Sequence, residues 1–133
     1  MLRVTSPLTT AEEQSLTRVM DCAFAVHREL GPGFKETIYE RAYCLELESR
    51  GIEFECEKAI DVHYKGGVIP GQRVDLVVES VVVVEIKAVP VLAKLHERQV
   101  RSYLKTMGLH VGLLVNFNTV LVKTGMRRIV HSG

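Results

Sequence analysis

The segment VDLVVESVVVVEIKAV, residues 74–89, constrains the fold more than any other stretch of the chain. It consists of two runs of β-branched residues separated by Glu79-Ser80, a pattern typical of two buried strands joined as a hairpin. Three charged residues, Asp75, Glu85 and Lys87, lie inside these runs. Because an unpaired charge in a buried strand is costly, the three must be paired with each other or with a ligand.

The length of the turn decides whether the two carboxylates meet. Glu85 and Lys87 are two residues apart, so they lie on one face of a strand. Asp75 faces Glu85 across an antiparallel hairpin only if the connection has an odd length, such as residues 79–81, or if the ladder contains a bulge. A turn formed by residues 79–80 alone would place Asp75 on the opposite face. We therefore predict an odd-length loop or a bulged ladder.

Two interpretations fit the charges of this hairpin. Neighbouring carboxylates repel each other unless a cation or a proton lies between them. Mg²⁺ takes oxygen ligands and is often held by only one or two carboxylates, and the carbonyl of Ile86 would add a ligand between Asp75 and Glu85. Lys87 could then orient an attacking water or stabilise charge on a phosphate oxygen. The alternative is a structural ion pair of Lys87 with either acid, and the hairpin taken alone favours that alternative.

Apolar periodicity predicts helices and further strands around the hairpin. Helices are expected from Thr9 or Thr10 to the GPG at 31–33, over 35–50 and over about 91–107. In the second helix, Ile38, Ala42 and Leu45, together with Tyr39, are expected to face inward. Strands are expected at 52–64, 73–78 and 82–88, and in HVGLLVNF and NTVLVKTG, which would be joined near residues 116–118.

The resulting order, α-α-β-β-β-α-β-β, predicts an α/β (α+β) fold with a central mixed sheet flanked by helices. The length of 133 residues is that of a single domain, which we expect to span residues 1–133. Hydrophobic residues make up 47% and charged residues 25%, values typical of a folded soluble protein. We expect no membrane segment, because no run reaches the roughly 18 apolar residues that a span requires.

Cysteine usage and charge carry less information. The three cysteines form no CxxC pair, so we expect buried or inert thiols in a reducing, cytoplasmic compartment. The net charge of +1 combines an acidic first half with a basic second half. A basic face attracts phosphates, but a solvated helix face and a basic tail explain the same pattern equally well. The positive charges gather in two clusters: Lys94, Arg98, Arg101 and Lys105, and then Lys123, Arg127 and Arg128.

The second and third expected helices add polar residues at helical spacing. Gln99 and Tyr103 are spaced i, i+4 and therefore lie on one face, one turn apart. Glu36 and Tyr39 are i, i+3 neighbours in GFKETIYE, with Glu40 beside them. His96 lies three residues before Gln99, where a surface histidine is favoured over a residue of the site. A lone glutamate on a helix is usually solvated, so each of these signals is weak by itself.

Taken in order, these motifs resemble a known family. GPGFKETIYE, Asp75, Glu85-x-Lys87 and Gln99-x-x-x-Tyr103 resemble the GxxExxY family of small bacterial proteins. That family is similar to the PD-(D/E)XK nuclease superfamily, especially its RecB-like branch. The resemblance runs from about His27 to the KTGMRRIV segment, and its one departure is Val74, which stands where the superfamily's name has a proline.

The resemblance implies a restriction-endonuclease-like core and a nuclease that cleaves DNA or RNA by water attack, with Mg²⁺ or Mn²⁺ as cofactor. It also implies a role for each motif. The acids bind the metal, the lysine is catalytic, and the last motif braces the site and contacts nucleic acid. By residue, the implied metal site is Glu36, Asp75 and Glu85, to which the hairpin geometry adds the backbone carbonyl of Ile86. The implied catalytic lysine is Lys87, and the implied bracing pair is Gln99 and Tyr103.

Two other functions remain open from the sequence. The chain could be a catalytically silent module that keeps the nuclease fold and binds nucleic acid or a partner protein. It could also be a structural protein whose charges form ion pairs. In either nucleic-acid role, substrate choice could depend on a homo-oligomer or on a partner protein. The discriminating observation is whether Glu36, Asp75, Glu85 and Lys87 meet in one open pocket.

Overall fold

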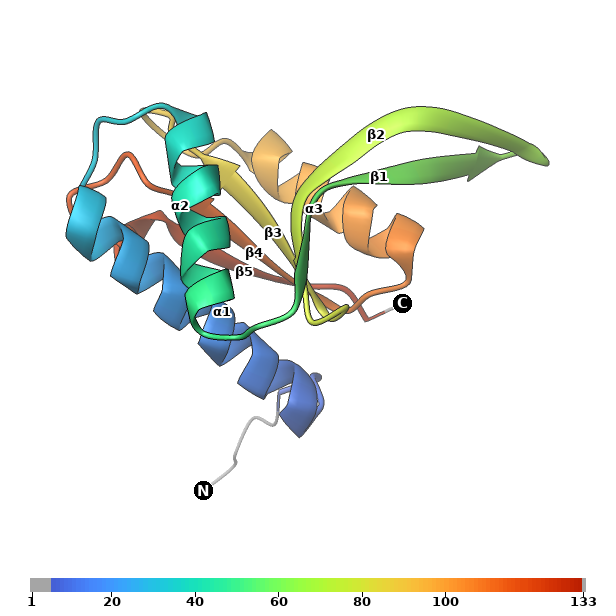
Figure 1. Ribbon diagram of the computed structural model, residues 1–133. Coiled ribbons are helices and arrows are strands. Elements are labelled where there is room, and N and C mark those ends of the chain that lie inside the picture. Colours follow the sequence, from blue (N-terminus) through green and yellow to red (C-terminus); the bar gives the residue numbers. More distant parts are fainter. Residues whose placement is uncertain (1–5, 133) are drawn as a thin grey trace, which may run out of the picture.

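The predicted order of helices and strands is confirmed by the computed structural model, which describes residues 6–132. One short 3₁₀ helix, η1, is inserted before the last strand (Figure 1). In chain order the elements are α1 (Thr10–Leu30), α2 (Glu36–Ser49), β1 (Phe54–Tyr64), β2 (Gly67–Val78), β3 (Val82–Lys87), α3 (Lys94–Met107), β4 (Val111–Asn116), η1 (Val122–Gly125) and β5 (Met126–Val130).

The five strands form one sheet in the order β1-β2-β3-β4-β5. β3 and β4 are parallel and the other neighbours are antiparallel, so the sheet is mixed, as predicted. α1 and α2 cover one face and α3 covers the other (Figure 1). The core therefore consists of two apolar layers, one on each side of β3 and β4.

This arrangement explains the continuous apolar run of β3. Val82, Val84 and Ile86 pack in the layer under α1 and α2, whereas Val83 packs in the layer under α3. A strand that is covered on both faces needs apolar residues at nearly every position, which is why simple alternation is missing. Glu85 has the same parity as Val83, so its side chain faces α3.

The hairpin between β2 and β3 has the predicted odd-length connection. Its ladder pairs Leu76 with Val84 and Val78 with Val82, which leaves a loop of residues 79–81. Glu79 and Ser80 adopt left-handed backbone conformations, with φ of 54° and 56°. The register therefore places Asp75 opposite Glu85.

The inward face of α2 differs from the prediction. Ile38 and Leu45 are 46% and 49% exposed, whereas Tyr39, Tyr43 and Leu47 are fully buried and Cys44 is nearly so. The two tyrosines can be buried because their hydroxyls donate hydrogen bonds to backbone carbonyls, Tyr39 to Gly31 and Tyr43 to Val19. The buried stripe therefore follows the aromatic residues, while Ala42 is only half-buried.

The prediction of a strand in NTVLVKTG is wrong. Residues 117–125 form a loop and η1, and the last strand is Met126–Val130 in the basic segment that follows. β4 ends at Asn116, whose side-chain oxygen accepts hydrogen bonds from the backbone of Val89 and Asn118. The consecutive apolar residues Val120, Leu121 and Val122 resemble a strand in sequence, but the first two are exposed at the outside of the loop.

β2 begins at Gly67, well before the predicted residue 73, and β1 and β2 extend beyond the rest of the sheet (Figure 1). The ladder is irregular between Ile60 and Val62, where Gly71 has a φ of 114°. Residues 61–71, all exposed, form the part of the hairpin beyond this irregularity. We call these residues the hairpin arm.

No helix within residues 6–132 is long and apolar enough to cross a membrane. Cys22 and Cys44 are buried, as expected, and burial raises the pKa of their thiols to about 11 and about 12. Cys56 instead lies exposed on β1, so its inertness stays a prediction.

The close approach of α3 to β4 yields a test of the packing. A Cβ added at Gly112 would lie 2.6 Å from Val100 Cγ1 and 3.3 Å from the carbonyl oxygen of Val83. We expect Gly112→Ala to lower the free energy of unfolding by about 1–3 kcal/mol through overpacking, measured by urea denaturation. Val100→Ala in the same chain should recover part of this loss, and strictly additive effects of the two substitutions would contradict the contact.

Candidate active site

The sheet opens at Asp75. The ladder between β2 and β3 ends with the pair Leu76 and Val84, and side chains replace the next backbone bonds. The backbone N–H of Asp75 donates to Glu85 Oε1 at 3.1 Å, and the backbone N–H of Ile86 donates to Asp75 Oδ2 at 2.8 Å. The two acids therefore hold the separating strands together through their carboxylates.

The alternation of β2 also breaks at this residue. Leu76 and Val78 pack in the layer under α1 and α2, and Val77 packs in the layer under α3. Strict alternation would place Val74 with Leu76, yet Val74 packs under α3. The regular alternation of side chains between the two faces of β2 is therefore interrupted at Asp75. The Asp75 carboxylate reaches both the backbone of β3 and acids outside the hairpin.

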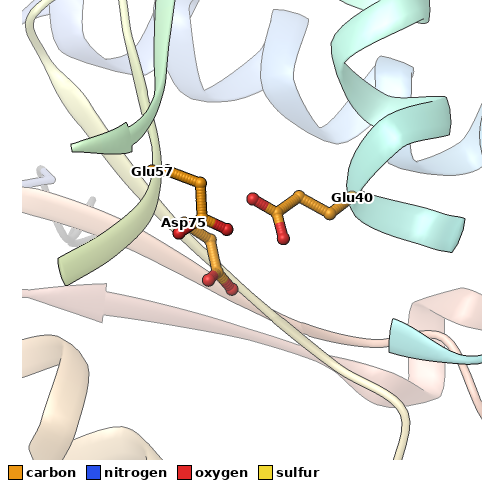
Figure 2. A group of neighbouring side chains, drawn as sticks. All are labelled: Glu40, Glu57 and Asp75. Atoms are coloured by element: carbon orange, nitrogen blue, oxygen red, sulfur yellow. The ribbon is translucent and has the colours of Figure 1, made fainter. Parts of the chain in front are cut away.

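Those acids are Glu40 and Glu57. One carboxylate oxygen from each of Glu40, Glu57 and Asp75 lies within 4.8 Å of the others (Figure 2). Glu40 comes from α2 and Glu57 from β1, where it lies between the pairs Cys56–Leu76 and Lys58–Val74 and hence opposite Asp75. Figure 2 shows the Glu40 side chain reaching from the helix toward the two strand residues.

Sequence reasoning did not assign a role to either residue. Glu40 stood in the GPGFKETIYE motif, one helical turn after Glu36, so the spacing i, i+4 was an available signal. Glu57 had no such signal, because its place opposite Asp75 depends on the pairing of β1 with β2. Glu36 is exposed at the start of α2 and is outside the three-acid group, although its charge contributes to raising the pKa of Asp75.

The tyrosine of the same motif fixes the position of α2. The Tyr39 hydroxyl donates to the carbonyl of Gly31 at 2.5 Å and accepts from the N–H of Phe34 at 3.1 Å. Its ring stacks on Phe117, with centroids 4.6 Å apart and an angle of 6° between the planes. Tyr39 therefore anchors the start of α2 to the loop that precedes it and to the end of β4, and this positions Glu40.

Lys87 lies on the other side of Glu85. Its Nζ is 3.5 Å from Glu85 Oε2, and Glu85 is only 3% exposed. Lys87 also lines an open cavity of about 490 Å³, so the carboxylate does not enclose the ammonium. This geometry weighs against a purely structural ion pair. The other lining residues are Leu95, His96, Arg98, Gln99 and Ser102.

The pair predicted on α3 borders the same region. Gln99 lines the cavity, and the nearly buried Tyr103 hydroxyl accepts a hydrogen bond from Gln72 Nε2 at 2.9 Å. Burial and the nearby charge of Glu85 raise the pKa of Tyr103. His96 lies at the surface in the first turn of α3 and also lines the open cavity, and its Nδ1 accepts from the N–H of Ala93 at 3.0 Å.

The electrostatics of the acids are unfavourable when all of them are ionised. Burial and the charge of Asp75 raise the pKa of Glu85 to about 7. Burial, a hydrogen bond to Glu57 and the charge of Asp75 raise the pKa of Glu40 to about 8. Burial, together with the charge of Glu36, raises the pKa of Asp75. These closely spaced carboxylates therefore repel one another when ionised, and a bound proton or cation reduces that repulsion.

The donor set fits a hard divalent cation. Glu40, Glu57 and Asp75 offer carboxylate oxygens close to one another, and Mg²⁺ and Mn²⁺ bind such oxygens. Glu85 adjoins this group through its bond to the Asp75 backbone. An acid cluster at an opened sheet edge, with a lysine beside it, is a site suited to phosphoryl chemistry.

Comparisons with known proteins agree with a site for phosphoryl chemistry. The family model described as the PD-(D/E)XK nuclease superfamily matches residues 13–129, and the chain belongs to that superfamily. Its mixed sheet flanked by helices is a restriction-endonuclease-like core. Members of the superfamily generally use divalent metals, which the acid cluster fits. No curated protein matched the chain.

A solved structure with a similar fold illustrates the likeness. It is the crystal structure of a protein designated SSO0001, which is 21% identical, with a TM-score of 0.54. The similarity covers 71% of this chain and 49% of that protein, so the matched region spans about half of its length. At this identity the likeness concerns the fold alone.

The raised pKa values predict how stability depends on pH without divalent cations. Glu85 and Glu40 bind a proton more tightly in the folded protein than in the unfolded chain, where a glutamate has a pKa near 4.5. Their stabilising effect is complete below pH 4.5 and is lost as the pH rises through about 7 and about 8. We therefore expect the melting temperature in EDTA to fall between pH 5 and pH 8.5, measured by circular dichroism.

Two controls make this test specific to the acid cluster. Glu40→Gln should flatten the fall, and Mg²⁺ or Mn²⁺ added at pH 8.5 should raise the melting temperature by binding the folded state. A wild-type melting temperature that stays level over this range, or that responds to pH as Glu40→Gln does, would contradict the assignment.

Proposed function

We propose that the protein is a nuclease that hydrolyses phosphodiester bonds in DNA or RNA and depends on Mg²⁺ or Mn²⁺. The observation that carries the proposal is the series of contacts from Glu40 through Asp75 and Glu85 to Lys87, the last of which lines an open cavity. The acids offer oxygen ligands for the cation, and the cavity offers space for a substrate next to the ammonium. Membership of the nuclease superfamily supports the same function.

Within this proposal, Asp75 and Glu85 would hold the cation, together with Glu40, Glu57 and the carbonyl of Ile86. Glu36 remains a proposed contributor to the metal site, directly or through water, because it lies one helical turn before Glu40. A bound Mg²⁺ or Mn²⁺ would supply Lewis acidity and lower the pKa of a coordinated water.

Lys87 acts on the phosphate side of the site. Its ammonium lies 3.5 Å from Glu85 and faces the cavity, so it can orient a water between the acids and the substrate. The same charge stabilises the negative charge that develops on a phosphate oxygen during the attack. Glu85 keeps the ammonium in place, because the contact restricts a side chain that would otherwise be flexible.

Tyr103 and Gln99 serve as positioning residues on α3. Tyr103 lies close enough to Glu85 for that carboxylate to raise its pKa, and its hydroxyl is held by Gln72. Gln99 lines the cavity one turn earlier on the helix and is available to a phosphate or a sugar. Together they link the acid cluster to the surface that would receive nucleic acid.

Finer assignments also belong to the proposal. The motifs support placement in the GxxExxY family and the RecB-like branch, and a bacterial origin follows from that placement. The free cysteines support a reducing, cytoplasmic compartment. We further propose that residues 1–133 act as one nuclease domain, with substrate choice completed by a homo-oligomer or a partner protein.

Removing the lysine charge tests the catalytic proposal. We expect Lys87→Ala to lower the rate of metal-dependent cleavage about 10²–10³-fold, because a preorganised charge at the developing oxyanion is lost. Cleavage of single- and double-stranded DNA and RNA would be followed on denaturing gels with Mn²⁺, Mg²⁺ or EDTA. Lys123→Ala, which removes an exposed lysine outside the cavity, is the matched control.

Metal-dependent cleavage that survives both Lys87→Ala and Asp75→Ala would contradict the proposal. A folded protein that binds Mn²⁺ and nucleic acid but yields no product would assign the chain to the catalytically silent binding module.

The two helix acids can be separated by metal binding. Glu40 belongs to the close carboxylate group and Glu36 does not, so Glu40→Gln should weaken Mn²⁺ binding more than Glu36→Gln. We expect a loss of at least tenfold for Glu40→Gln, measured by isothermal titration calorimetry. A larger loss for Glu36→Gln would return the role of metal ligand to Glu36.

A further inference from the structure

A second cavity continues from the candidate active site along α3. It has a volume of about 420 Å³ and shares Ser102 with the 490 Å³ cavity beside Lys87. We call the two cavities together the α3 groove. One wall of its far half is α3 and the other is the base of the hairpin arm. The residues lining that far half are Val62, His63, Gln72, Ser102, Tyr103, Lys105 and Thr106.

The charge of the α3 groove is opposite to that of the acid cluster. Lys87, Arg98 and Lys105 line it, and none of its lining residues is a carboxylate. Within residues 6–132, neither Arg98 nor Lys105 forms an ion pair. By contrast, Arg101 of α3 donates to the carbonyl of Val130, outside the groove. The groove thus presents unpaired cations and hydrogen-bonding side chains to a negatively charged ligand.

The hairpin arm also carries an exposed aromatic ring, two residues beyond Val62 of the groove wall. Val62 lines the far cavity, and Tyr64, two residues further along β1, lies on the same face of the strand. Tyr64 is 61% exposed, and the Lys65 ammonium lies 5.5 Å from its ring centroid. A two-stranded hairpin that is exposed on both faces is marginally stable alone, so a bound ligand would stabilise the arm.

We propose that a single-stranded segment of nucleic acid, flanking the scissile phosphate, binds in the α3 groove between α3 and the hairpin arm. Its phosphates contact Arg98 and Lys105, and one of its bases stacks on Tyr64. This inference rests on the proposed nuclease function and adds the form of the substrate to it.

Two physical arguments favour single-stranded nucleic acid as the ligand of the α3 groove. A cationic groove with an aromatic platform is the combination by which proteins hold single strands without reading sequence. Each cavity also has the size of a small-ligand pocket, which accommodates individual nucleotides. The acid cluster lies at the end of the α3 groove that contains Lys87. The bound nucleic-acid strand would therefore run from the acid cluster toward the hairpin arm.

Binding of labelled oligothymidylate tests the groove separately from cleavage. Fluorescence anisotropy would compare probes of about 12 and about four nucleotides, lengths at the two ends of the usual site size for single-strand grooves. Ca²⁺ would replace Mg²⁺, and the probe would be checked for intactness after each titration. We expect the longer probe to bind more tightly than the shorter one and than a duplex of equal length.

Two substitutions of exposed side chains supply the decisive readouts. Tyr64→Ala should weaken binding of the longer probe about tenfold, whereas Tyr64→Phe, which keeps the ring, should bind as the wild type does. Lys105→Ala should reduce the slope of log affinity against log salt by about 0.7, the effect of one lost phosphate contact on a single strand. Arg28→Ala, on α1 at the opposite face of the sheet, is the control for loss of one exposed cation.

Unchanged affinity and salt slope in Tyr64→Ala and Lys105→Ala would overturn the proposal, as would equal binding of the duplex. A wild-type dimer that becomes monomeric in Tyr64→Ala, with binding unchanged, would assign the arm to a second copy of the chain and overturn it too. Failure of the nuclease function is distinguishable, because it leaves these binding effects intact while cleavage is absent. Failure of the groove alone leaves cleavage dependent on metal and on Lys87.

Discussion

The reciprocal contact between Asp75 and Glu85 is the constraint on which the rest of the site depends. Each carboxylate accepts a backbone N–H, from Ile86 and from Asp75 respectively, at the point where β2 and β3 separate. These bonds replace ladder hydrogen bonds, so the strands can part without leaving the two N–H groups unpaired. The opening gives Asp75 access to Glu40 and Glu57, and it leaves Lys87 at the edge of a cavity. A regular ladder through this position would close the site.

The cost of this arrangement is the concentration of negative charge. Burial and mutual repulsion raise the pKa values of Glu85 and Glu40 toward neutrality, so the empty cluster is most stable when it is partly protonated. A bound divalent cation would remove the same repulsion and would thereby stabilise the folded state. The fold keeps the acids in place through groups outside the cluster, above all Tyr39, whose stacking on Phe117 holds α2 against the sheet.

The hairpin shows which structural features can be predicted from local sequence patterns. The charged residues inside the β-branched runs required an odd-length loop or a bulged ladder if the two carboxylates were to meet, and the loop of residues 79–81 is the first of these. Helix α1 likewise begins where Thr9 and Glu12 form a capping box. The same kind of pattern failed for residues 118–125, because a short run of β-branched and apolar residues resembles a strand even where these residues pair with no neighbouring strand. It failed again for Ile38 and Leu45, whose exposure follows from the burial of two tyrosines.

The sequence by itself determined the order of the elements and the set of charged residues in the central hairpin, since these depend on neighbours along the chain. Only the tertiary structure decided which acids meet. Glu40, Glu57 and Asp75 lie on α2, β1 and β2, and their contact depends on the packing of α2 and on strand pairing. It also decided that the cations of α3 divide between the α3 groove and the surface of β5, because the orientation of the helix on the sheet selects the residues that line a cavity.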